Sequence, residues 1–130
     1  MTRFATRQLG ERPDAIAPDG SEVRLLAVTE RGSMAHFRLS PGSVSRAVVH
    51  GTVEEIWFFV AGRGEMWRHD GEREETVAVA AGISISLPVG TRFQFRAAPD
   101  SHLEAVGVTM PPWPGAHEAA FVDGVWEPTG

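Results

Sequence analysis

The stretch GSVSRAVVHGTVEEIWFFVAG, residues 42–62, decides the fold of this chain. Glycine stands at both ends, four residues separate His50 from Glu55, and six more separate Glu55 from the closing Gly62. Residues that are two apart on a strand point to the same face of a sheet, and a neighbouring strand can bring a carboxylate alongside them. The stretch therefore predicts two strands that place a histidine and a glutamate together.

A second stretch, GISISLPVGTRFQFRA, starts at Gly82 and ends at Ala97. Five residues separate Gly82 from Pro88, two separate Gly90 from Phe93, and three separate Phe93 from Ala97. Both halves alternate apolar and polar residues, which is typical of strands that have one face on a core. Two strands joined by a Pro-x-Gly turn are expected here.

Together the two stretches resemble the two sequence motifs of the cupin family. The first cupin motif reads Gly, five residues, His-x-His, three or four residues, Glu, six residues and Gly, and here Val48 replaces its first histidine. The second motif reads Gly, five residues, Pro-x-Gly, two residues, His, three residues and Asn. In this chain Phe93 and Ala97 occupy the His and Asn positions, while the glycine and proline positions of both motifs are kept.

The resemblance implies an all-β fold, the double-stranded β-helix or jelly-roll barrel of the cupins. A chain of 130 residues holds one hydrophobic core rather than two. We therefore expect a single cupin domain over residues 1–130, with a barrel core of about 22–110 and irregular segments at both ends.

Fourteen glycines and nine prolines separate short apolar stretches, which indicates many short antiparallel strands. The Asp70-Gly71 pair predicts a tight hairpin turn, residues 62–64 predict a further turn, and one short helix is expected near 117–121. The expected strands are 22–29, 34–40, 44–50, 55–61, 65–69, 74–78, 83–87, 92–97 and 102–109.

A cupin metal site, as the resemblance implies, holds Fe, Mn, Ni, Zn or Cu through three histidines and one glutamate. Here His50 and Glu55 remain as a partial metal site, and Val48 and Phe93 make the cavity more apolar. A catalytic metal normally has at least three protein ligands, so a tightly bound divalent metal is not expected. The alternative is a metal held through non-standard ligands, for which the candidates are His36, Gln94 and His102.

His50 and Glu55 can instead form a metal-free acid–base pair. A carboxylate beside an imidazole in an apolar cavity is expected to raise the pKa of the histidine and to orient its ring. Such a pair can move protons in an isomerisation, a dehydration or a cyclisation. The plainer hypothesis is a hydrogen-bonded remnant in the core. The substrate pocket is expected to contain Arg46, Val48, Trp57, Phe59, Phe93 and Phe95, although each of its aromatic residues taken singly is also typical of a core.

Composition excludes several classes of function. A formal net charge of −5 argues against a nucleic-acid partner, and the absence of cysteine excludes disulfides and thiolate ligands. No apolar run is long enough for a membrane span, and the first residues lack the core of a signal peptide. We expect no membrane partner and a cytoplasmic location.

Three functions remain open at this point. The first is a small-molecule enzyme of the cupin type that works without a tightly held metal, with His50 and Glu55 as its polar centre. The second is a non-catalytic module that senses a hydrophobic metabolite. The third is a metal-dependent oxygenase or lyase. A homodimer is expected in each case, because the open edge strands of a short barrel need cover.

Overall fold

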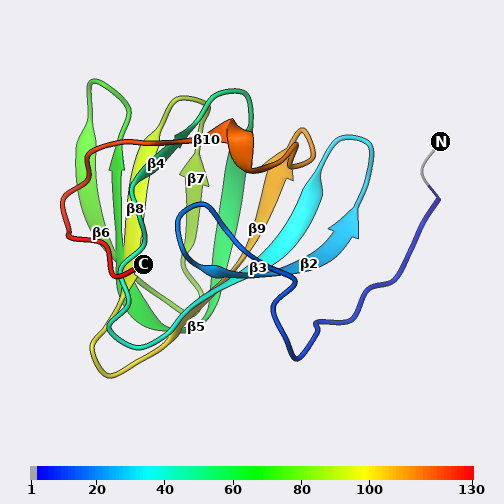
Figure 1. Cartoon of the computed structure of the whole chain (residues 1–130), viewed down its shortest axis with the longest axis horizontal. Helices are drawn as coiled ribbons and strands as arrows, with labels where there is room; N and C mark the ends of the chain where they lie inside the picture. The colour runs from blue at the N-terminus through cyan, green and yellow to red at the C-terminus, as the bar shows by residue number, and fades with distance from the viewer. Residues whose placement is uncertain (1–2) are drawn as a thin grey trace.

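Two antiparallel β-sheets that share one long strand make up the fold in the computed structural model, which describes residues 3–130. The first sheet has the order β1-β2-β3-β9-β5-β7, and the second has the order β6-β5-β8-β4-β10. The strands are β1 (Ala15–Ile16), β2 (Glu22–Val28), β3 (Ser33–Leu39), β4 (Val48–His50), β5 (Glu54–His69), β6 (Glu74–Ala80), β7 (Ser84–Leu87), β8 (Arg92–Ala97), β9 (Leu103–Met110) and β10 (Ala119–Phe121). The sheets curve around a common interior (Figure 1), which confirms the all-β jelly-roll barrel.

The long strand β5 runs through both sheets and joins them. Its first half pairs with β9 and β7, and its second half pairs with β6 and β8. The register shifts between Phe59 and Ala61, where the strand passes from one sheet to the other. Alternate residues of its first half, Glu55, Trp57 and Phe59, face the interior between the sheets.

The turn predicted at residues 62–64 is wrong, since these residues continue β5. Gly62 and Gly64 allow the backbones of neighbouring segments to approach β5 closely, and neither forms a turn. A Cβ on Gly62 would lie 1.7 Å from the carbonyl oxygen of His102, and one on Gly64 would lie 2.1 Å from that of Arg96. The two predicted strands on either side are therefore one strand of 16 residues.

The interior between the sheets is packed with apolar side chains. The buried cluster takes residues from every strand from β3 to β9 and is rich in aromatic rings. The predicted strand 44–50 is regular over Val48–His50, and Val44 makes an isolated bridge to Arg96. The predicted helix is a 3-10 turn, Ala116–Glu118, and it leads directly into β10.

The C-terminal strap, residues 119–130, is fastened along the second sheet (Figure 1). The Gln94 amide group donates to the carbonyl oxygens of Ser45 and Trp126, each at 2.8 Å, and accepts from the N–H groups of Val125 and Trp126 at 3.0 and 3.1 Å. Gly124 makes room for this group, since a Cβ there would lie 2.2 Å from Gln94 Oε1. The irregular C-terminal segment is thus an integral part of the barrel.

The outer face of the first sheet carries exposed apolar side chains in register. Met34, Val108 and Ile56 form one cross-strand row, and Val106 and Phe58 belong to the next. Ile56 and Phe58 are each about half exposed.

The predicted homodimer stays a prediction. No helix in the described residues is long and apolar enough to cross a membrane.

Candidate functional site

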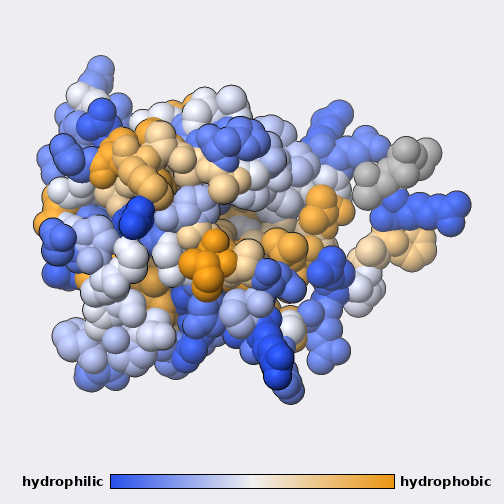
Figure 2. Space-filling model, in the orientation of Figure 1, coloured by the Kyte–Doolittle hydropathy of each residue, from blue (hydrophilic) through white to orange (hydrophobic). Residues whose placement is uncertain are grey.

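A cavity of about 490 Å³ opens into the barrel interior. Its walls come from β2, β3, β5 and β9, from the segment before β2, and from the loop that follows β9. Hydrophobic side chains surround a hollow on the face shown in Figure 2, and the rim of the cavity includes the exposed side chains of Ile16, Leu25 and Val28. A concave, mostly apolar space of this size is typical of a small-molecule site.

His50 and Glu55 meet inside this cavity, as predicted from their spacing. His50 ends β4, and Glu55 lies at the start of β5 after a short loop. His50 Nδ1 lies 3.3 Å from Glu55 Oε2, and both side chains are less than a tenth exposed. The pair therefore forms a buried polar centre in an apolar wall.

The electrostatics of this pair differ from the sequence-based expectation. Burial raises the pKa of Glu55 to about 8, and the nearby charge of Asp19 adds to this effect. Burial lowers the pKa of His50, and the Glu118 carboxylate opposes that shift in part. The prediction that a carboxylate raises the histidine pKa is wrong, because desolvation penalises the charged form of both groups more than they stabilise each other. At neutral pH Glu55 is a carboxylic acid and His50 a neutral imidazole.

Aromatic rings form the wall next to the pair. The rings of Phe37 and Trp57 stack with centroids 4.8 Å apart, and Phe93 meets Trp57 edge-on at 5.9 Å. Gly107 makes this stack possible, since a Cβ there would lie 2.7 Å from Trp57 Cδ1 and 2.8 Å from Phe37 Cε2. Trp113 packs on His50 at 5.1 Å, so it covers the acid–base pair from the loop side.

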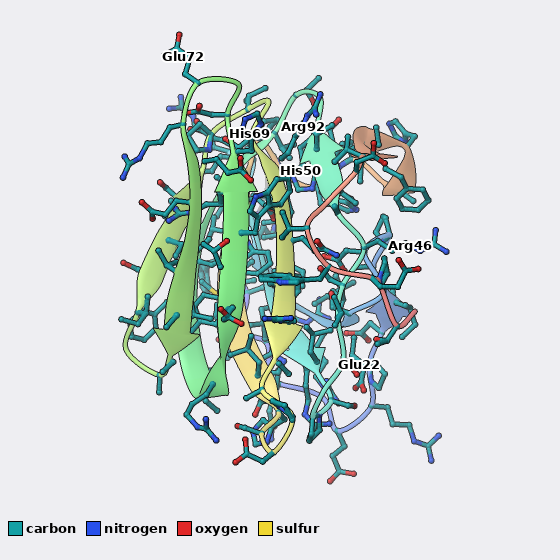
Figure 3. The ribbon with its side chains drawn as sticks, turned by 90° about the vertical axis from the view of Figure 1, so that its left-hand side faces the viewer. Glu22, Arg46, His50, His69, Glu72 and Arg92 are labelled. Carbon is teal, nitrogen blue, oxygen red and sulfur yellow. The ribbon has the colours of Figure 1, made fainter. Side chains whose placement is uncertain are left out.

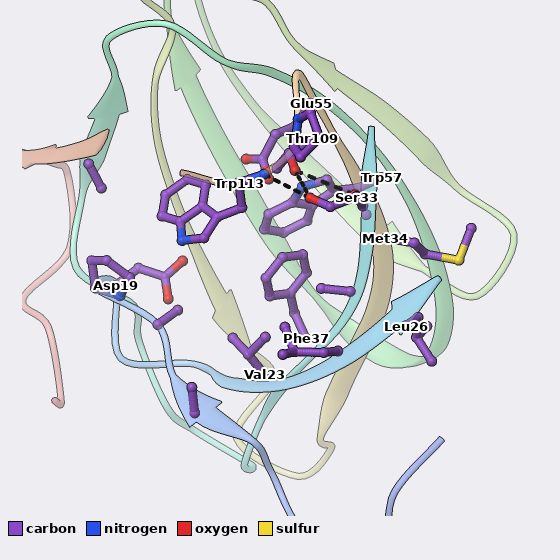
Figure 4. A pocket seen from close by; sticks show the side chains of 18 of the residues that line it. Asp19, Val23, Leu26, Ser33, Met34, Phe37, Glu55, Trp57, Thr109 and Trp113 are labelled. Atoms are coloured by element: carbon purple, nitrogen blue, oxygen red, sulfur yellow. Dashed lines mark hydrogen bonds between the residues drawn. The ribbon is translucent and has the colours of Figure 1, made fainter. Parts of the chain in front are cut away.

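The position of Trp113 is fixed by a small hydrogen-bond network at the edge of the first sheet. Its backbone N–H donates to Ser33 Oγ at 2.9 Å, and that hydroxyl is in turn bonded to Thr109 Oγ1 (Figure 4). All three residues line the cavity. The Pro-rich loop that carries Trp113 is thereby fixed beside the cavity that this residue lines.

The structure divides the buried residues of the predicted pocket into two groups. Trp57 and Phe93 line the cavity together with His50 and Glu55. Three others are buried in the core around it without lining it: Val48, Phe59 and Phe95.

The prediction for Arg46 is wrong. Its side chain is exposed, lies on the outer side of the barrel (Figure 3), and stacks over the Phe121 ring at 4.6 Å. The regular strand starts only at Val48, so alternation counted back from His50 fails before that point. Ala47 and Val48 are consecutive and both buried, which shows the break in the period.

Sequence reasoning missed Asp19, which lines the cavity from the segment between β1 and β2. Its side chain is buried, and its Oδ1 accepts hydrogen bonds from the Ser21 N–H at 3.0 Å and the Ser21 hydroxyl at 2.6 Å. Burial raises the pKa of Asp19, and these two hydrogen bonds oppose the shift. The surrounding Pro18-Asp19-Gly20 sequence looks like an ordinary turn, and its place in the wall depends on the tertiary fold.

The donor set does not fit the four-ligand metal site of the cupins. Across residues 3–130, no three His, Asp or Glu side chains converge as metal ligands. His50 Nδ1 faces Glu55, and the other two ligand positions hold Val48 and Phe93. His36 and His102, the candidates for a replacement, both bind Glu104 away from the cavity, at 2.8 and 2.9 Å. Gln94 is fully used by the C-terminal strap.

Comparison with known proteins gives a match of fold. No family model and no curated protein match the sequence. A variant of Streptomyces PAC13, solved with uridine, superposes with a TM-score of 0.70 at 15% identity, over 96% of this chain and 95% of that chain. KdgF from Halomonas sp. gives a TM-score of 0.64 at 18% identity, over 73% of this chain and 82% of that chain.

A larger protein matches in the same way. A variant of oxalate decarboxylase from B. subtilis gives a TM-score of 0.70 at 17% identity, over 90% of this chain and 30% of that chain. These neighbours are cupin-fold proteins, which agrees with the motif spacing and with the two-sheet barrel. The chain therefore has the fold of a small cupin domain.

Proposed function

We propose that this protein binds a small organic molecule in its barrel cavity and catalyses a proton-transfer reaction on it, an isomerisation or a dehydration, without a tightly held metal. The observation that carries the proposal is the buried contact between His50 and Glu55 at 3.3 Å in an aromatic cavity. A buried pair of this kind is costly to maintain unless it is used. PAC13, which has the same fold, is solved with uridine, and a cavity of about 490 Å³ suits a molecule of that size.

The protonation states give each residue a role. Glu55, with a pKa of about 8, holds a proton at neutral pH and can donate it to an oxygen of the ligand. His50 is neutral, and since Nδ1 faces Glu55, Nε2 is the ring nitrogen that can take a proton from a carbon of the ligand.

In the first step of an isomerisation, both residues transfer a proton. His50 removes the proton on the carbon next to a carbonyl group while Glu55 protonates the carbonyl oxygen, which gives an enol, an imidazolium and a carboxylate. The imidazolium and the carboxylate lie on neighbouring side chains in an apolar cavity, where their attraction is much stronger than in water. When that carbon carries a hydroxyl group, the imidazolium then protonates the former carbonyl carbon while the carboxylate takes the proton of this hydroxyl, which completes the isomerisation and restores both residues. When a hydroxyl group on the next carbon instead leaves as water with the imidazolium proton, and the enol returns its proton to the carboxylate, the result is a dehydration.

Hydrogen exchange tests this reaction class without knowledge of the substrate. The protein is incubated in D2O with a panel of aldoses, ketoses and α-hydroxy ketones, and deuterium uptake at carbon is measured by mass spectrometry. We expect uptake with the unaltered protein, and a fall of about 100-fold or more in His50→Ala and Glu55→Gln. His117→Ala removes an exposed histidine outside the cavity and serves as the matched control.

Two results would contradict the proposal. A ligand that binds in the cavity without exchange would favour a non-catalytic binding module. Stoichiometric metal in protein purified without a chelator would favour a metal-dependent reaction through ligands other than the cupin set.

A further inference from the structure

The segment that precedes β2 forms part of the cavity wall. Residues 15–19 line the cavity, and Asp19 is 6% exposed although it belongs to a turn. Its backbone is tied to the barrel, since the N–H of Arg46 donates to the Asp19 carbonyl oxygen at 2.7 Å. The Asp19 carboxyl group is therefore held at a fixed place beside the cavity (Figure 4).

The two oxygens of this carboxyl group have different surroundings. Oδ1 accepts both hydrogen bonds from Ser21, and within the described chain no donor reaches Oδ2. The fully buried polar side-chain atoms without a partner in the described chain are His36 Nδ1 and Trp57 Nε1, so Oδ2 is not closed off from the cavity that Asp19 lines. A ligand that brings a hydrogen-bond donor to Oδ2 can bond to it there.

The charges around the cavity favour some ligands over others. Glu55 is a second acidic group in the same wall, and its pKa responds to the charge of Asp19. Arg7 is the one arginine among the lining residues in the described part of the chain, and its side chain is exposed. An anionic group placed at Asp19 would meet two acidic groups and no buried cation, so an anion is disfavoured there.

The two acidic groups lie on different sides of the cavity. Figure 4 shows Glu55 near the top and Asp19 at the lower left, with the rings of Trp113, Trp57 and Phe37 around the space between them. A ring-shaped ligand packed against these aromatic side chains can therefore present one end to His50 and Glu55 and the other end to Asp19.

We propose that Asp19 is a specificity-determining residue that binds a hydrogen-bond donor of the ligand, a hydroxyl or an ammonium group, and rejects anionic substituents at that end. This inference rests on the proposed function, because it assigns the far end of the same ligand. It defines the ligand class as ring compounds that carry a donor group away from the reacting carbon and no carboxylate or phosphate at that position.

Three probes of one ring size test this assignment: benzylamine, benzyl alcohol and benzoate. Binding is measured by saturation-transfer difference NMR, which detects weak binding at millimolar concentration. We expect benzylamine or benzyl alcohol to bind more tightly than benzoate, and the order of these two shows whether the donor is an ammonium or a hydroxyl group.

The Asp19→Asn substitution keeps an oxygen toward Ser21 and turns an amide NH2 toward the cavity. We expect it to weaken benzylamine binding about tenfold, the loss of one charged hydrogen bond, and to strengthen benzoate binding. Ser21→Ala perturbs the same turn but leaves the carboxyl group, so it should keep the wild-type order. Asp100→Asn removes an exposed charge far from the cavity lining and should change nothing.

The outcomes separate this inference from the function on which it rests. If benzoate binds best, or if Asp19→Asn changes none of the three affinities in a folded protein, the role of Asp19 is wrong and the acid–base pair is unaffected. If none of the probes binds to the unaltered protein, the cavity is not a ligand site and both proposals fail.

Discussion

Glu55 and Glu118 are both buried and both act on His50, yet they are bonded in opposite ways. Glu55 has His50 as its partner at 3.3 Å, and its pKa is raised to about 8 by burial. Glu118 accepts hydrogen bonds from the N–H and hydroxyl of Thr52 and from the N–H of Val53, and although burial opposes the shift, these bonds lower its pKa. Glu118 is thus held by three hydrogen bonds to the loop before β5, whereas Glu55 faces a histidine ring in the cavity.

The same contrast separates the C-terminal strap from the cavity as a whole. In the strap, the buried Gln94 amide makes four hydrogen bonds. In the cavity, the hydrogen bonds that Asp19 accepts from Ser21 both go to Oδ1, and among the described residues no donor bonds to Oδ2. A carboxyl oxygen that lines a cavity and carries no hydrogen bond supports a role of that cavity in binding or catalysis.

The largest effect on stability is expected in the C-terminal strap, where the buried amide group is fully hydrogen-bonded. Gln94→Ala removes four hydrogen bonds and leaves buried backbone groups of the strap without partners, so we expect unfolding free energy to fall by about 3 kcal/mol. Urea unfolding measures this value. A loss below about 1 kcal/mol would show that the strap is not held by Gln94. It would also contradict the contrast between the C-terminal strap and the cavity.

On the cavity side, Glu55 should make stability depend on pH. Its folded pKa of about 8 lies above the ordinary glutamate pKa of 4.5. The stabilisation from its protonated form is full at low pH and is lost as pH rises toward 8. Between about pH 7 and 8, where His50 is mostly neutral in both states, unfolding free energy should fall by about 1.4 kcal/mol at most, since one pKa unit corresponds to 1.36 kcal/mol.

Glu55→Gln provides the control for this pH dependence. The glutamine has a similar shape and does not titrate, so the decline between pH 7 and 8 should flatten in urea unfolding at each pH. An unchanged decline in the variant would assign the effect to other groups and would contradict the raised pKa of Glu55.

The smallest effect is expected from Glu118→Gln. The amide oxygen can still accept from the two backbone N–H groups, and the amide NH2 group can donate to the Thr52 hydroxyl, but the charge assistance is lost, so unfolding free energy should fall by about 1 kcal/mol. The pKa of His50 should also fall further, because the Glu118 charge opposes its lowering. NMR titration of the imidazole measures the second effect, and a rise of the His50 pKa would contradict this assignment.

Much of the barrel could be predicted from the sequence because its signals are local. Alternation located the strands around Ile85 and Phe93, and motif spacing brought His50 and Glu55 together. The continuity of β5 could not be predicted, since glycines that allow close strand approach look like turn glycines.

Other parts of the site depend on contacts that no local pattern records. Arg46 precedes the regular strand, so alternation gave it the wrong face. Asp19 belongs to a turn that reaches the cavity through a backbone bond to the segment before β4. The protonation of the acid–base pair follows from the depth of burial, which a residue pair in a sequence does not reveal.

The size of the cavity depends on Gly107, which lies behind its aromatic wall. The stacked rings of Phe37 and Trp57 occupy the space that any side chain at this position would need. Even alanine would push the rings toward the open volume that a ligand would use. The volume of the cavity thus depends on the absence of a Cβ at residue 107. A related chain with a larger residue here would have a smaller cavity, suited to smaller molecules.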